Sequence, residues 1–187
     1  MKPGQGPAAG QILISTEPGR GGYFDQSVVL LLEHNENGSL GVCLHHLSDL
    51  GMVEVLRPFE DLLTQPAQLF EGGPVSPQAA ICLAQVMNPD EEPPGWKPVF
   101  DDVGILDLET PVELVRGAFS QLRIYVGLAG WDAGQLEGEL IRGSWFRSRA
   151  SVEEVFGTPD GLWRRALRRV GGTPGQWSTW TGTPVHN

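Results

Sequence analysis

The stretch RIYVGLAGWDAGQLEGELIRGSW, residues 123–145, changes its pattern of apolar side chains part-way along. It opens with the apolar run 124–128, whose β-branched and aromatic side chains are typical of a strand. Gly130 follows, where a residue without Cβ permits a tight turn. Beyond it, Leu136 and Leu140 lie four residues apart, which places them on one face of a helix. The stretch therefore predicts a strand, a tight Gly-Trp turn and a helix.

Two glycine-rich segments raise the question of anion binding. A turn that leads from a strand into a helix could hold a phosphate on its free backbone N–H groups. Asp132 already stands at the end of the helix dipole that favours an anion, and neither common phosphate-loop pattern is present. The sequence favours a structural turn with Asp132 near the N-cap. Residues 19–22 (GRGG) could form an anion nest around Arg20, but a flexible turn is the simpler interpretation.

Three blocks occur in a fixed order along the chain. They are EHN at residues 33–35, followed by Gly38 and Gly41, then EGGPV at residues 71–75, and finally GLAGWDAGQLEGEL at residues 127–140. Together they resemble the signature of the AlgH/YqgE family of small bacterial proteins. The chain departs from the family pattern at Leu128, where Tyr is usual, and at residues 45–47 (HHL), where Asn-Arg-Pro is usual.

The resemblance extends over residues 11–171 and implies a compact single domain. The family is associated by name with transcriptional regulation, and no biochemical activity is established for it. The resemblance thus implies a fold more directly than a function.

Bulk composition predicts one globular domain. The chain has 187 residues, of which 40% are hydrophobic and 19% charged, values that suit a packed core. We expect a disordered arm over residues 1–10, the domain over 11–172 and a tail over 173–187. No apolar run is long enough for a membrane span, and the N-terminal arm lacks the features of a secretory signal. With two cysteines outside any C-x-x-C motif, the sequence predicts a cytoplasmic protein with buried free thiols.

The predicted fold class is α+β. Residues 27–33 and 40–45 read as two strands joined at Asn37-Gly38, a strong hairpin signal. Further short strands suggest a mixed, mostly antiparallel sheet of about seven strands, curled toward a barrel, with helices packed around it. We predict those helices within the ranges 50–63, 110–120, 133–142, 151–157 and 158–170, the second of them opening with a capping box at Thr110-Pro111-Val112-Glu113.

The candidate binding residues come from all three family-like blocks. We predict a binding surface formed by His34, Gly72, Gly73, Gly130, Trp131, Gln135 and Glu137. The alternative is that these residues only shape the core and the turns. The sequence predicts no catalytic residue, no metal site and no cofactor.

Several residues invite a chemical role that the sequence does not support. His34, His45 and His46 suggest a metal, but His45 and His46 alternate to opposite strand faces and no third ligand has ordinary zinc spacing. Ser76 lacks the G-x-S-x-G frame of a nucleophile. A hydrolase that uses Glu33, His34 or Glu137 stays open as an alternative.

The charge distribution argues against direct binding to DNA. The net charge is −10, with 6 basic and 20 acidic residues up to position 141 and 7 basic and 3 acidic residues beyond it. One predicted helix presents four arginines, Arg164, Arg165, Arg168 and Arg169, but DNA-binding domains are usually basic overall. We therefore favour a non-enzymatic regulatory or binding module, monomeric or homodimeric, with a protein partner rather than nucleic acid or membrane. Trp177 and Trp180 in the tail could support dimerisation.

Overall fold

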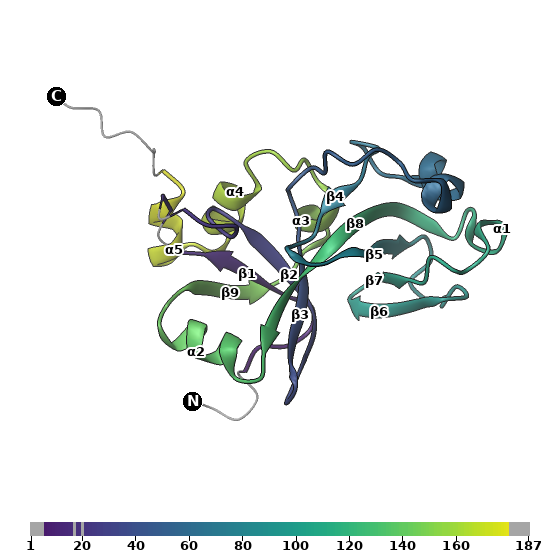
Figure 1. The fold of residues 1–187 in the computed structure, drawn as a ribbon. Coiled ribbons are helices and arrows are strands. Elements are labelled where there is room, and N and C mark those ends of the chain that lie inside the picture. The colour runs from purple at the N-terminus through teal and green to yellow at the C-terminus, as the bar shows by residue number, and fades with distance from the viewer. Residues whose placement is uncertain (1–5, 17, 20, 180–187) are drawn as a thin grey trace.

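The protein folds around one strongly curled, mostly antiparallel sheet. The structure is a computed structural model that describes residues 6–179 except Glu17 and Arg20. Nine strands are present in that part of the chain, and eight of them follow the order β6-β7-β5-β8-β3-β2-β1-β9 (Figure 1). Strand β8 (Phe119–Asp132) is long and curved and belongs to both halves of the sheet. The predicted α+β class is confirmed.

The first half of the sheet consists of β1 (Gln11–Ser15), β2 (Val28–Asn35), β3 (Gly38–Cys43) and β9 (Trp145–Arg149). The predicted hairpin of β2 and β3 is confirmed. Side chains alternate between the two faces of this half, as a pleated strand requires. One face carries the core cluster with Ile12, Ile14, Val28, Leu30 and Val42, and the other carries the cluster with Leu13, Val29, Leu31 and Cys43.

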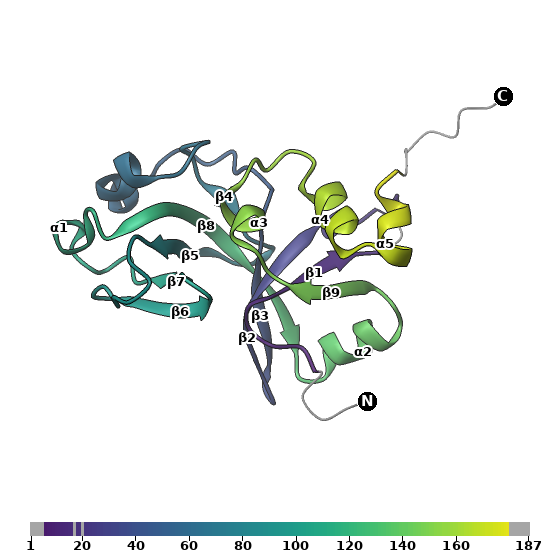
Figure 2. The same cartoon turned by 180° about the vertical axis from the view of Figure 1, so that it is seen from behind.

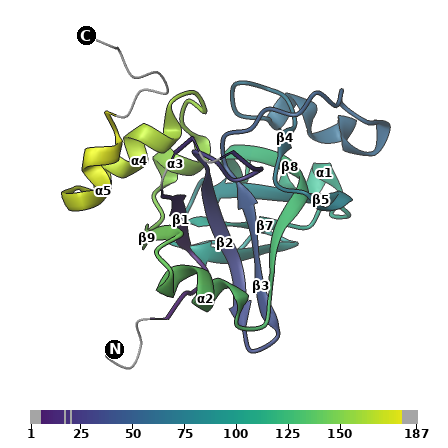
Figure 3. The same ribbon diagram turned by 60° about the vertical axis from the view of Figure 1, so that its left-hand side comes forward.

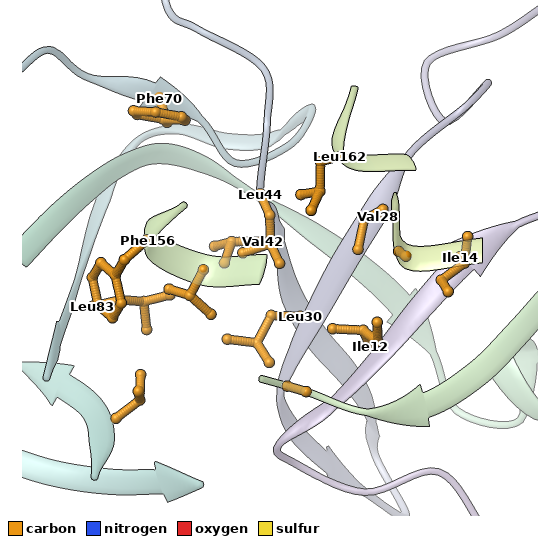
Figure 4. Packing of buried hydrophobic residues seen from close by; sticks show 14 of the residues in the cluster. Ile12, Ile14, Val28, Leu30, Val42, Leu44, Phe70, Leu83, Phe156 and Leu162 are labelled. Atoms are coloured by element: carbon orange, nitrogen blue, oxygen red, sulfur yellow. The ribbon is translucent and has the colours of Figure 1, made fainter. Parts of the chain in front are cut away.

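Helices α3 (Val152–Phe156) and α4 (Leu162–Val170) cover the first of these faces (Figure 2). Phe156 and Leu162 of these helices belong to the same cluster of buried side chains as Leu30 of β2, and Figure 4 shows Phe156 beside Leu83 and Leu162 near Leu44. The helix predicted within 151–157 is present as α3, and a capping box of Ser151 and Glu154 opens it. A further helix, α5 (Gly172–Trp177), lies within the predicted tail, and Trp177 packs against the core. Trp180 lies outside the described residues.

The second half of the sheet consists of β5 (Val75–Val86), β6 (Trp96–Phe100) and β7 (Val103–Leu106), with the short β4 (Phe70–Glu71) parallel to β8. The 3₁₀ helix η1 (Glu54–Leu62) and the short α1 (Val112–Val115) pack on it and bury their apolar side chains in a second cluster. Within the described residues, none of the helices is long and apolar enough to cross a membrane.

The helix predicted to end near Ser120 is wrong in its extent. Only Val112–Val115 is helical, Pro111 caps it without the predicted capping box, and β8 already begins at Phe119. Tertiary pairing decides this boundary, because Phe119 pairs with Val86 of β5. The predicted helix over 158–170 likewise begins only at Leu162, after the residues preceding it form a turn.

The predicted Gly-Trp turn is also wrong. Gly130 and Trp131 lie inside β8, opposite Leu40 and Ser39 of β3. The chain turns two residues later, and Gly134, with a φ of 76°, caps helix α2 (Gln135–Ile141) in place of Asp132. Pairing with β3 extends the strand beyond its apolar run, and the glycines do not interrupt it.

A buried arginine ties the two halves to α3. Arg123 of β8 is 1% exposed, and its guanidinium lies 4.3 Å from the ring centre of Phe70. It donates hydrogen bonds to backbone carbonyl oxygens at 2.6–3.3 Å, those of Gln65, Val155, Phe156 and Gly157. Three of these acceptors are at the C-terminal end of α3, where carbonyl groups lack helical partners.

Candidate functional site

The second face of β1, β2 and β3 is covered by α2, which lies beside β9 and the β2–β3 hairpin (Figure 3). Glu139 of α2 organises this cover. Its Oε2 accepts the indole N–H groups of Trp131 at 2.9 Å and of Trp145 at 2.8 Å, and its Oε1 accepts the side-chain amide of Gln135 at 3.0 Å. Gln135 in turn accepts the backbone N–H of Asp132 at 3.0 Å. These bonds fix the carboxylate and both indoles in one geometry.

Two aromatic residues of the loop between β1 and β2 complete the cluster. The ring of Phe24 stacks on Trp131 at 6.2 Å between centroids and meets Trp145 edge-on at 5.7 Å. Tyr23 lies edge-on to Phe24 at 5.0 Å. The tyrosine also donates a 2.7 Å hydrogen bond to Glu71 of β4, so the loop connects α2 with the EGGPV block.

A pocket of about 460 Å³ opens between this loop, the end of β1 and the α2–β9 connection. We call it the α2 pocket, and it is lined by Ser15, Thr16, Gly21, Gly22, Tyr23, Phe24, Asp25, Glu139, Arg142, Gly143, Ser144 and Trp145. The hydroxyl of Thr16 donates a 2.6 Å hydrogen bond to the Gly143 carbonyl, which joins the two walls. The volume of the α2 pocket falls within the range of about 300–1,000 Å³ that is typical of small-molecule sites.

The charged groups of the α2 pocket are unevenly placed. Asp25 accepts the backbone N–H of Gly19 through both oxygens, at 3.0 and 3.2 Å. The guanidinium of Arg142 folds back along α2, with Nη1 3.3 Å from the position that a Cβ on Gly138 would occupy. Asp25, Glu139 and Arg142 all line the pocket, so the described lining residues contribute two carboxylates and one guanidinium.

A short polar chain runs beside this cluster, on the same sheet face. His34 Nδ1 lies 2.8 Å from Ser39 Oγ, and its Nε2 lies 3.5 Å from Glu137 Oε1. This order of hydroxyl, imidazole and carboxylate is that of an activated nucleophile. Ser39, however, is only 4% exposed, because it lies opposite Trp131 beneath the cover of α2.

A second pocket, of about 270 Å³, lies near this chain and includes Ser39 and Trp131 in its lining. Its other lining residues include Glu33 and Leu40, which are paired across β2 and β3. Strand alternation places Glu33 and Leu40 on the face opposite His34. Glu33 and His34, two of the three residues of the hydrolase hypothesis, therefore do not converge.

Gly72 and Gly73 lie away from α2 and serve a close backbone crossing. A Cβ on Gly72 would stand 2.3 Å from the Gly127 carbonyl oxygen, and one on Gly73 would stand 2.1 Å from that of Leu128. The Gly72 carbonyl also accepts the Cys43 N–H at 2.8 Å. Side chains at these two positions would push the turn off β8. Gly130 is less crowded, with Val75 the nearest group at 3.5 Å.

The histidines after β3, His45 and His46, form a half-buried pair near Tyr23. The rings of His45 and His46 lie 4.5 Å apart, and that of Tyr23 lies 5.9 Å from His46. Burial, reinforced by His46, lowers the pKa of His45 to about 4. Burial also raises the pKa of Cys43 to about 12, and Cys43 and Cys82 are free and buried as predicted.

Within residues 6–179, apart from the two positions left out, no group of three or more His, Cys, Asp and Glu side chains is placed to hold a metal ion. Ser76 has a φ of 46° and, among the described residues, makes no hydrogen bond to an imidazole or a carboxylate.

Three of the four α4 arginines bind groups of their own chain. Arg164 donates to the Ser178 carbonyl and Arg165 to the carbonyls of Thr158 and Asp160. Arg169 pairs with Glu154. The predicted outward basic face is thus largely used to hold α3, α4 and α5 together, and it supplies little free charge for phosphates.

Comparison with known proteins identifies the family. The model of the AlgH-like family matches residues 12–175. The chain belongs to the AlgH-like family. A UPF0301 protein of Streptomyces avermitilis is 40% identical over 164 residues, covering 86% of this chain and 85% of the relative. One from Streptomyces coelicolor is 38% identical over 182 residues, covering 95% and 94%.

Two solved structures share the AlgH-like fold. A crystal structure of a protein from Corynebacterium diphtheriae matches with a TM-score of 0.86 at 25% identity, covering 94% of this chain and 93% of that one. The solution structure of AlgH from Pseudomonas aeruginosa matches with a TM-score of 0.66 at 24% identity, covering 96% and 98%. The comparisons establish the family and its fold.

The seven predicted binding residues fall into separate places in this AlgH-like chain. Trp131 and Gln135 meet at Glu139, and His34 and Glu137 meet beside them. Gly130 lies within β8 opposite Leu40, and Gly72 and Gly73 lie farther back along β8. None of the seven lines the α2 pocket. Tyr23, Phe24, Glu139 and Trp145 were not among the predicted site residues. The adjacent aromatic residues after the GRGG run were the one available signal in the sequence. The contact of Phe24 with Trp145 could not be predicted, because it spans about 120 residues of chain.

Proposed function

We propose that the chain is a non-enzymatic, cytoplasmic binding module with a regulatory role, and that its ligand occupies the α2 pocket. The observation that carries this proposal is the pocket itself. It is about 460 Å³ in volume and combines the β1–β2 loop with the α2–β9 connection. The lining residues Glu139 and Trp145, and Trp131 behind them, all belong to the stretch 123–145.

Binding is supported because Trp145 in the pocket lining and Trp131 behind it are already ordered. Trp131 and Trp145 are 6% and 7% exposed, and both are held by Glu139. A site whose groups are fixed before the ligand arrives loses little conformational entropy on binding.

The chemistry of the described residues supports binding rather than catalysis. The Ser39 hydroxyl beside His34 is buried, so a substrate would reach it only if α2 moved away. The His34–Glu137 contact of 3.5 Å is long, and the Glu137 side chain is 43% exposed. We therefore assign this chain of polar groups to the attachment of α2.

A regulatory role is supported by the position of Tyr23. This residue lines the α2 pocket and bonds to Glu71, next to the Gly72–Gly73 crossing. A ligand that shifts Tyr23 would act on both halves of the sheet, and a protein partner could sense that shift.

A pocket-filling variant tests the proposal. Ser144 is exposed and lines the pocket, so Ser144→Phe should block it while leaving the core intact. Ser120→Phe, at an exposed position of β8, is the matched control. We expect the small-molecule fraction of a bacterial extract to raise the melting temperature of the wild type and the control, and not that of Ser144→Phe.

Two results would count against the proposal. One is a melting temperature that no extract fraction raises, or that rises equally in Ser144→Phe. The other is turnover of generic ester, phosphate or peptide substrates that is lost in His34→Gln, which would favour the hydrolase alternative.

A further inference from the structure

We infer that the α2 pocket selects an organic cation, meaning an alkylammonium or quaternary ammonium group. The inference rests on the proposed binding role of this pocket and specifies its ligand. It follows from which groups line the pocket and from how its charges are already paired.

The pocket wall is rich in aromatic rings. Tyr23, Phe24 and Trp145 line it, and Trp131 stacks behind Phe24 at 6.2 Å. The faces of such rings attract cations, with trimethylammonium groups among the ligands that aromatic cages hold well. Polar neutral ligands gain no comparable electrostatic attraction from these rings.

The charges of the pocket add to this preference. Among the described lining residues, the two carboxylates of Asp25 and Glu139 outnumber the single guanidinium of Arg142, whose Nη1 lies toward Gly138. Glu139 accepts three hydrogen bonds from neutral donors and no ion pair is formed with it among the described residues. Its negative charge is therefore oriented but not neutralised by a side-chain cation.

The same geometry disfavours an anion. The backbone N–H of Gly19, at the start of the GRGG run, already donates to both oxygens of Asp25. An anion in this loop would have to displace a carboxylate and would meet a second one at Glu139. The Gly19 N–H, which the alternative of an anion nest would have offered to a ligand, is thus already used within the loop.

Choline and its neutral carbon isostere 3,3-dimethylbutan-1-ol form the decisive pair of probes. They have nearly the same shape and differ in charge. Calorimetric titration of the full chain should show choline binding about tenfold or more tighter than the alcohol, the ratio expected for a cation at a partly desolvated aromatic site. Affinity should fall as salt is raised from 20 to 300 mM, on the order of several-fold, because the carboxylates are partly solvated.

One variant and a matched control test how much the charge of Asp25 contributes to choline binding. Asp25→Asn keeps an acceptor for the Gly19 N–H and removes the charge, so choline affinity should fall about three- to tenfold. Asp90→Asn, in the loop between β5 and β6, is the matched charge control and should leave affinity unchanged. Circular dichroism of each variant verifies that the fold is retained.

The cation can come from a free metabolite or from a lysine side chain of a partner. Choline represents the first source and a short peptide with one trimethyllysine the second, and binding of either supports the inference. Equal affinity for choline and the alcohol, or tighter binding of inorganic phosphate, would overturn it. If those probes fail while extract still stabilises the wild type but not Ser144→Phe, the cation inference falls and the binding role remains. If the extract also fails, both fall.

Discussion

Trp131 and Trp145 donate their indole N–H groups to the same atom, Oε2 of Glu139, at 2.9 and 2.8 Å. Their strands, β8 and β9, are not neighbours in the sheet. The carboxylate therefore links two separated strands through α2. This helix buries only one of its side chains, Leu136, so its position depends on polar bonds more than on packing.

Replacing Glu139 should loosen that link. Glu139→Leu leaves two buried indole donors without an acceptor, and we expect it to lower the free energy of unfolding by about 3 kcal/mol. Glu137→Leu is the matched control, because the Glu137 side chain is 43% exposed, and it should cost less than about 1 kcal/mol. Urea denaturation measures both variants. Equal losses would show that Glu139 does not organise the site.

The two glycines of the EGGPV block should tolerate no side chain. Gly72→Ala and Gly73→Ala place a Cβ within 2.3 and 2.1 Å of carbonyl oxygens of β8, so each should cost about 3 kcal/mol or more. Gly51→Ala has open space around it and should change stability by less than about 1 kcal/mol. Thermal melts of the three variants test this order. A stable, soluble Gly73→Ala protein would contradict it.

Arg123 should control the stability of α3 in particular. Arg123→Met removes the donors to four carbonyl groups, and we expect a loss of about 2–4 kcal/mol. Hydrogen exchange should increase in α3 more than in α2. Arg116→Met, at an exposed site, serves as the control. Uniform exchange throughout the chain after Arg123→Met would indicate a general core role instead.

Acid should destabilise the chain through His45. Burial lowers its pKa to about 4 from an ordinary 6.5, so between these values the unfolded chain binds a proton that the folded chain does not. The free energy of unfolding should fall as the pH drops through this window, by about 3 kcal/mol in total, and should not change above it. His46, Arg165 and the backbone of Gln26 are the groups that act on this ring.

Comparison with His45→Gln isolates this contribution. The variant should show a shallower loss of stability between pH 6.5 and pH 4 in urea titrations, because its side chain does not titrate. Parallel curves for the two proteins would mean that His45 is protonated in the folded chain.

The elements that could be predicted from sequence are those fixed by local signals. The β2–β3 hairpin has an Asn-Gly turn between apolar strands, and α3 has a capping box at Ser151. The family blocks implied the fold class. The predicted element boundaries were wrong where pairing between distant segments overrode local preference. Gly130 and Trp131, for example, belong to β8 because they pair with β3.

The candidate site was less accessible to sequence reasoning. The stretch 123–145 contributes Glu139 and Trp145 to the pocket lining, whereas Gly72 and Gly73 of the predicted site serve a backbone crossing. Tyr23 and Glu139 come from segments that only the fold brings together at one pocket. No spacing within either segment indicates that they line the same cavity.

The most direct test of the α2 pocket is a ¹⁵N–¹H titration with choline that follows the indole N–H signals. Trp145 lines the pocket, whereas Trp96 donates to the Ala84 carbonyl in the other half of the sheet and serves as an internal reference. Our account predicts a saturable shift of the Trp145 signal with an unchanged Trp96 signal. An unmoved Trp145 signal, or equal shifts of both, would contradict it.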